Sequence, residues 1–77
     1  MKHFKVLGSG CRNCKNTVAL LEKAANELDS EISVEKVEQP AQIMAYGVMS
    51  TPAVVLDEQV IHKGSVPSYQ QVLEWLQ

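Results

Sequence analysis

The chain has 77 residues, a formal net charge of −2 at pH 7 and a hydrophobic content of 45%. The net charge is small and no run of like charges occurs, which argues against a nucleic-acid-binding surface and against attraction to anionic membranes. Uninterrupted apolar stretches such as Ala53 to Leu56 are far too short to span a bilayer. We therefore expect one soluble domain over residues 1–77, with no nucleic-acid or membrane partner.

The first strand is predicted over His3 to Leu7, where Phe4 and Val6 face the same side. Gly8 and Gly10 then end it. This start is interrupted too early by charge and glycine to be a signal peptide, so we expect a cytoplasmic protein.

A turn that carries both cysteines follows, Gly8-Ser9-Gly10-Cys11-Arg12-Asn13-Cys14, and it opens into a helix predicted over Arg12 to Asp29. The apolar positions of this helix step by three and four residues and form one stripe: Cys14, Val18, Leu21, Ala25 and Leu28. Cys14 is therefore expected to point at the core. Cys11 is expected beside the helix N-terminus, where unpaired N–H groups and the helix dipole favour a thiolate.

Three further strands are predicted after this helix. The polar residues between Glu31 and Val37 alternate with apolar ones, which indicates an edge strand. Ala53 to Leu56 is the most strand-like run in the sequence. Asp57-Glu58 turns the chain back into Gln59 to Lys63, which completes a hairpin.

Two further helices complete the predicted elements. Pro40 suits the first turn of a short helix that runs through Tyr46 and is closed by Gly47. Ser68-x-x-Gln71 fits a capping box at the start of the last helix, whose apolar positions are Tyr69, Val72, Leu73 and Leu76. The order βαβαββα predicts an α/β fold, in which a right-handed crossover pairs the first two strands in parallel and the hairpin adds two antiparallel strands at the other edge.

The spacing of Cys11 and Cys14 indicates chemistry more than structural cross-linking. In the chain-entropy model a disulfide that closes a four-residue loop stabilises the fold by about 2 kcal/mol, against about 4.7 kcal/mol for a hundred-residue loop. In a cytoplasmic protein, a CxxC is more often catalytic or metal-binding than structural. The spacing alone does not choose between these two uses.

The chain resembles the thioredoxin superfamily, and within it the small thioredoxin-like proteins called redox-active disulfide proteins. The resemblance covers nearly the whole chain and rests on Gly10-Cys11-Arg12-Asn13-Cys14 after a strand, on Thr51-Pro52 before the third strand, and on the terminal helix. It implies a compact thioredoxin fold with a four-stranded mixed sheet and helices on both faces. It also implies that the Thr51–Pro52 bond is cis and packs near Cys11.

The resemblance implies a thiol–disulfide oxidoreductase in which Cys11 is the nucleophile and Cys14 resolves the mixed disulfide. The residues expected to bind substrate are Gly10, Arg12, Asn13, Thr51 and Pro52. Tyr46, Val48 and Met49 are a candidate apolar docking rim. We expect a monomer that needs no cofactor and no metal, whose partners are a protein or small-molecule disulfide and an unidentified thiol reductase.

The sequence departs from thioredoxins around the cysteines. Arg12-Asn13 replaces the Gly-Pro dipeptide that tunes the redox potential. Six residues before Cys11, where the resemblance would place a buried aspartate that helps to deprotonate the second cysteine, the chain has Lys5. The proton acceptor for Cys14 is therefore open. Residues 63–67 also lack the Gly-Gly pair followed by an acid with which glutaredoxin-like proteins bind glutathione.

Other functions compete with the redox interpretation. Heavy-metal-associated domains also place a CxxC between a first strand and a long helix, and its two thiolates bind soft ions such as Cu(I). That family ends in a strand, whereas this chain ends in a predicted helix. Structural zinc would need further ligands, for which only His3 and His62 are available. An interaction domain that has lost redox use is a third class, against which the two intact cysteines speak.

Overall fold

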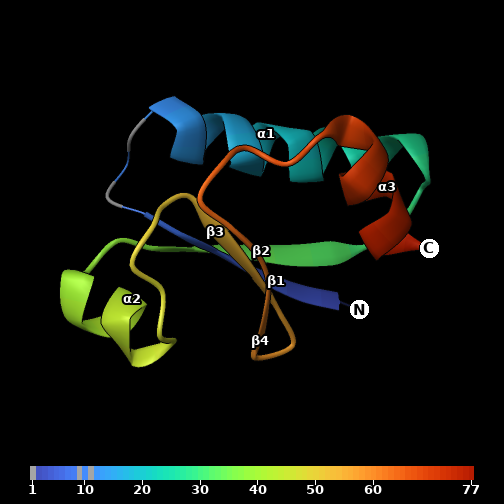
Figure 1. The fold of residues 1–77 in the computed structure, drawn as a ribbon. Helices are drawn as coiled ribbons and strands as arrows, with labels where there is room; N and C mark the ends of the chain where they lie inside the picture. The colour runs from blue at the N-terminus through green and yellow to red at the C-terminus, as the bar shows by residue number, and fades with distance from the viewer. Residues whose placement is uncertain (1, 9, 11) are drawn as a thin grey trace.

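The computed structural model describes residues 2–8, 10 and 12–77. The elements follow the predicted βαβαββα order (Figure 1): β1 (Lys2–Leu7), α1 (Arg12–Glu27), β2 (Ile32–Val37), α2 (Pro40–Ala45), β3 (Ala53–Leu56), β4 (Gln59–Lys63) and α3 (Tyr69–Leu76). No helix in these described ranges is both long and apolar enough to cross a membrane.

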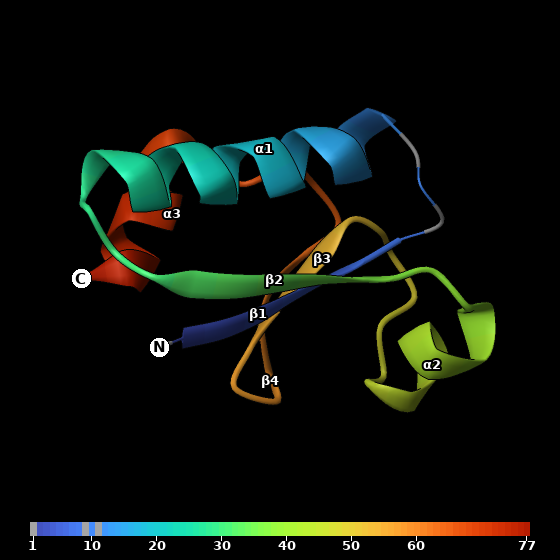
Figure 2. The same cartoon turned by 180° about the vertical axis from the view of Figure 1, so that it is seen from behind.

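The four strands form one mixed sheet in the order β2-β1-β3-β4. β1 runs parallel to β2 and antiparallel to β3, and β3 pairs antiparallel with β4. Helices α1 and α3 cover one face of this sheet and α2 covers the other (Figures 1 and 2). The predicted α/β fold with helices on both faces is confirmed.

Two hydrophobic clusters lie on the two faces of the sheet. The cluster under α1 and α3 is built from Phe4, Val6, Leu21, Ala24, Ala25, Val54, Val72 and Leu76. The cluster under α2 is built from Leu7, Val37, Ile43, Val48, Ala53 and Val55. Because successive side chains of a strand point to opposite faces, β1 and β3 each contribute to both clusters.

The predicted stripe of α1 is correct at Cys14 and wrong at Leu28. The helix ends at Glu27, and Asp29 has the left-handed backbone conformation, with φ of 52°. Leu28 therefore lies beyond the helix and is 39% exposed. Thr17 is fully buried instead, which its hydroxyl tolerates because it donates to the carbonyl oxygen of Asn13 at 2.8 Å.

The second strand lies at an edge of the sheet, as predicted, but Val37 at its end is buried. Val37 lies opposite Leu7 in the parallel register, and both side chains are buried in the cluster under α2. Alternation then places the side chain of Lys36 on the α1 side of the sheet. The capping box of α3 is confirmed, since Gln71 N donates to Ser68 Oγ at 3.1 Å and Ser68 N donates to Gln71 Oε1 at 3.0 Å.

Candidate active site

Cys14 lies in the first turn of α1, is only 5% exposed and is disulfide-bonded. The prediction that it points at the core is confirmed by this burial. Cys11, the predicted nucleophile, lies outside the described residues. The residues that surround Cys14 form the described part of the site.

Gly8 brings the end of β1 directly against Cys14. A Cβ at residue 8 would occupy the space of Cys14 Sγ and would lie 3.7 Å from Thr51 Cβ. The backbone is held there because Gly8 N donates to the carbonyl oxygen of Val37 at 2.9 Å. Cys14 and Thr51, which are 37 positions apart in sequence, thus both lie close to one glycine.

The Thr51–Pro52 peptide bond is cis, in agreement with the expectation from the resemblance. Thr51 is exposed and Pro52 is buried. The carbonyl oxygen of Pro52 accepts a hydrogen bond from Gly64 N at 3.0 Å, which ties this loop to the end of β4. Of the predicted substrate-binding residues, Thr51 is thus placed beside Cys14.

The other predicted substrate-binding residues lie in the turn and at the start of α1. Gly10 is half-buried and has φ of 82°, a left-handed conformation that favours glycine. A Cβ there would come within 2.9 Å of Glu38 Oε2. Arg12 and Asn13 are exposed in the first turn of α1.

A pocket of about 70 Å³ lies beside Cys14, between the N-terminal half of α1 and the end of β2. Its lining residues are Gly8, Gly10, Cys14, Lys15, Val18, Lys36 and Glu38. The pocket therefore combines one carboxylate and two ammonium groups with the buried sulfur. No sequence motif marks Glu38 as a site residue. Its position just after β2 could have placed it near the cysteine turn, because neighbouring parallel strands end at the same edge of a sheet.

A more apolar groove of about 280 Å³ runs from Thr51 to α2. Its lining residues are Glu38, Pro40, Ile43, Met44, Val48, Met49 and Thr51. Met44 is 69% exposed and Met49 is 95% exposed. Of the predicted docking rim, Val48 and Met49 line this groove, whereas Tyr46 lines a different hollow, beside Lys5.

Lys5 takes no part in the pocket beside Cys14. Its Nζ donates to Glu58 Oε1 at 2.8 Å and to Tyr46 Oη at 2.9 Å. These bonds, with the one to Glu58 the larger cause, raise the pKa of Lys5 above its ordinary value of 10.5. Lys5, which the sequence places where the resemblance would have an aspartate, therefore forms an ion pair with Glu58.

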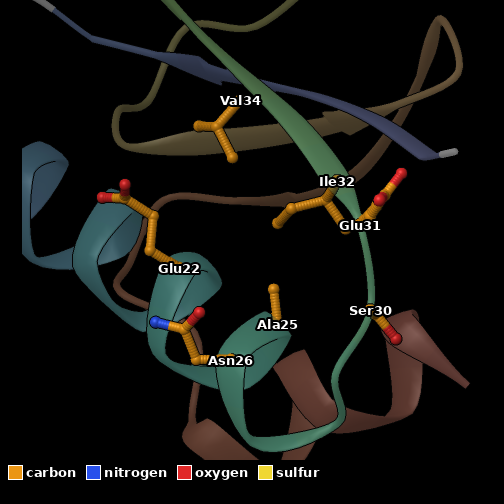
Figure 3. A pocket seen from close by; sticks show the side chains of 7 residues that line it. All are labelled: Glu22, Ala25, Asn26, Ser30, Glu31, Ile32 and Val34. Atoms are coloured by element: carbon orange, nitrogen blue, oxygen red, sulfur yellow. The ribbon is translucent and has the colours of Figure 1, made fainter.

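The hollow in Figure 3 lies at the other end of α1. It has a volume of about 470 Å³ and lies between the C-terminal half of α1 and β2. Its lining residues are Glu22, Ala25, Asn26, Ser30, Glu31, Ile32 and Val34. The described residues that line it include neither a sulfur nor a basic side chain.

The sequence model of the family described as Thioredoxin domain matches residues 2–77. The chain belongs to the thioredoxin family. It is 30% identical over 73 residues to a thioredoxin of Methanocaldococcus jannaschii, covering 95% of this chain and 84% of that one. It is 26% identical over 72 residues to a thioredoxin of Methanothermobacter thermautotrophicus, covering 94% of each chain. The resemblance given by the sequence is confirmed.

Membership of the thioredoxin family bears on the competing metal-binding interpretation. The chain ends in α3, which packs against α1 and contributes Val72 and Leu76 to the core. The heavy-metal-associated fold would have a strand at this place. The fold and the family therefore both favour the redox interpretation of the CxxC.

Proposed function

We propose that this protein is a thiol–disulfide oxidoreductase in which Cys11 attacks a substrate disulfide and Cys14 resolves the mixed disulfide. Membership of the thioredoxin family supports oxidoreductase activity in general. The observation that carries the proposal is the burial of Cys14 against Gly8, a glycine that Thr51 also approaches. Because the sulfur of Cys14 is buried, it is shielded from external disulfides. We therefore expect it to react with the mixed disulfide that forms on Cys11.

The proposed reaction exchanges one disulfide for another. The thiolate of Cys11 bonds to one sulfur of the substrate disulfide, and the other substrate sulfur leaves as a thiolate. Cys14 then attacks Sγ of Cys11, which forms the protein disulfide and releases the second substrate sulfur. The protein loses two electrons and the substrate gains them. The positive charges of Arg12 and Lys15, with the N-terminus of α1, favour thiolate at Cys11.

The surroundings of Thr51 suit a disulfide flanked by apolar residues. The groove that leads from Thr51 over Met44 and Met49 offers apolar contact to residues that flank such a disulfide. Gly10, Arg12, Asn13 and Pro52 are proposed to complete the substrate-binding surface. The proposed partners are a disulfide-containing protein or small molecule and a thiol reductase, encountered by a monomer in the cytoplasm.

Trapping of the mixed disulfide tests this proposal. Cys14→Ser should accumulate a covalent complex between Cys11 and a disulfide-containing protein such as insulin, detected by mass spectrometry and released by dithiothreitol. Cys11→Ser should form no complex and show no catalysed exchange. Equal trapping by both variants would contradict the roles assigned here. A tight stoichiometric Cu(I) complex without any disulfide exchange would favour the metal-binding function instead.

A further inference from the structure

The resolving step needs a base near Cys14. A thiolate, not a thiol, attacks a disulfide. An ordinary cysteine is only a few per cent thiolate at about pH 7. Cys14 is buried, and its side chain lines the pocket beside it. A group in or at that pocket is therefore well placed to take the proton, as fast resolution at neutral pH requires.

Lys5 does not meet this need. It is bonded to Glu58 and Tyr46 and lines hollows other than the one beside Cys14. Its raised pKa keeps it protonated at neutral pH, so it has no capacity to accept a proton. Among the described residues that line the pocket of Cys14, Glu38 is the one carboxylate.

The backbone places Glu38 at this pocket. In β2, Val37 is buried on the α2 side while Lys36 lines the pocket on the α1 side. Glu38, the next residue after the strand, lines the same pocket, and its Oε2 packs against Gly10 so closely that a side chain at residue 10 would contact it. Glu38 is also exposed, which lets it exchange protons with solvent.

We propose that the carboxylate of Glu38 accepts the proton of Cys14 through water in this pocket, an inference that rests on the proposed redox function. A pocket of about 70 Å³ has room for water molecules, since one needs roughly 10–15 Å³. In this scheme Glu38 does not touch the sulfur and acts on it through water.

The charges around the pocket suit such a transfer. Lys15 faces it from α1 and Lys36 faces it from β2. The groove on the other side of Glu38 is lined from α2 by Pro40, Ile43 and Met44, none of which is charged. The two ammonium groups stabilise one negative charge in the pocket, whether it sits on Glu38 or on the sulfur. The proton can therefore move between the two groups without creating an uncompensated charge.

In the resolving step the S–H proton of Cys14 passes through water to Glu38. The Cys14 thiolate then bonds to Sγ of Cys11, the mixed disulfide bond breaks, and the substrate sulfur leaves with the electron pair as a thiolate. Glu38 releases the proton to solvent afterwards. No oxidant besides the substrate disulfide is needed.

The reaction of the reduced protein with excess Ellman's reagent separates the two steps. The first thionitrobenzoate is released when Cys11 attacks, at a rate proportional to the reagent concentration. The second is released when Cys14 resolves the adduct, at a rate independent of that concentration. Glu38→Gln should slow the second release at least about tenfold at neutral pH. The difference should shrink above about pH 8.5, where hydroxide deprotonates an ordinary thiol. The first release should stay within about twofold of wild type.

Two matched variants separate a proton acceptor from a general effect of charge or structure. Glu35→Gln makes the same change three residues earlier, within β2, but residue 35 lines hollows shared with Lys5. It should leave both releases unchanged. Glu38→Asp keeps a carboxylate and should recover much of the second rate.

Three results would overturn the proposal. These are a second release in Glu38→Gln that matches wild type from about pH 6 to about pH 9, an equal slowing by Glu35→Gln, or a slowing that is the same at every pH. A missing first release, or one that survives Cys11→Ser, would instead refute the redox function itself.

Discussion

Gly8 lies so close to Cys14 that no side chain fits between the end of β1 and the buried sulfur. Gly8→Ala should therefore displace Cys14 or the turn. Overpacking of this kind lowers the free energy of unfolding by about 1–3 kcal/mol. Because the displaced atom is the reacting sulfur, release of the second thionitrobenzoate should also slow at least about tenfold. Urea unfolding and the Ellman's reaction measure the two effects.

Gly47→Ala is the control for Gly8→Ala. Gly47 has φ of 74°, but a Cβ there would meet nothing within 4 Å. Gly47→Ala should lower the free energy of unfolding by about 1–2 kcal/mol, because alanine disfavours this left-handed backbone conformation. It should leave both releases unchanged. Normal resolution in Gly8→Ala would show that the contact with Cys14 does not constrain the site.

The ion pair of Lys5 and Glu58 should stabilise the fold over a defined range of pH. The hydrogen bond from Lys5 lowers the pKa of Glu58 below its ordinary value of 4.5 in the folded protein. Its contribution is therefore present above pH 4.5 and is lost as the pH falls through the lowered value. The pKa of Lys5 is raised, so its contribution is complete below pH 10.5 and is lost at higher pH.

Glu58→Gln tests this range. Its free energy of unfolding should fall below that of wild type at neutral pH, and the difference should vanish in acid, where Glu58 is protonated in both states. Glu74→Gln, at an exposed position of α3, serves as the control.

Lys5→Met should leave both releases of thionitrobenzoate unchanged. A slower second release in Lys5→Met would contradict its exclusion from proton transfer.

The groove beside Thr51 should contribute to the binding of protein substrates. Met49→Gln should raise the KM for an unfolded protein disulfide about threefold to tenfold, as expected for the loss of one partly buried apolar contact. It should not change the reaction with Ellman's reagent, which is too small to reach along the groove. Leu28→Gln changes an exposed apolar residue beyond the far end of α1 and is the control. Equal effects of the two substitutions would argue against a docking groove.

The capping box of α3 should contribute about 1 kcal/mol to the free energy of unfolding. Ser68→Ala removes the oxygen that accepts the Gln71 N–H and should lower the free energy of unfolding by that amount. Ser33→Ala, at an exposed position of β2, should change stability little. Chemical denaturation of both variants checks this, and equal stabilities would show that the cap contributes nothing.

The sequence predicts those features that depend on neighbouring residues. The hairpin bounds are correct because Asp57-Glu58 separates two strand-like runs, and the start of α3 is correct because Ser68 and Gln71 cap each other locally. The apolar spacing of the helix continues to Leu28 and places it in the core, whereas the left-handed conformation of Asp29 cannot be recognised in that spacing.

The site depends on contacts between residues that are distant in the sequence, and such contacts are harder to predict from the sequence. A single glutamate after a strand is unremarkable until the pairing of β1 with β2 brings Glu38 to the turn that holds Gly10. Gly8 marks only the end of a strand in the sequence, and its contact with Cys14 follows from how α1 packs on the sheet. The resemblance alone connected the cysteines to Thr51-Pro52.

In the proposed reaction Cys11 and Cys14 have different roles, Cys11 as the nucleophile and Cys14 as the buried resolving group. Alkylation of the fully reduced protein by iodoacetamide from mildly acidic to alkaline pH, with each site quantified by peptide mass spectrometry, tests it most directly. We predict that Cys11 is modified first and reacts well below the pH at which ordinary thiols react, while Cys14 lags behind. Equal modification of both cysteines, with the pH dependence of ordinary thiols, would contradict the account.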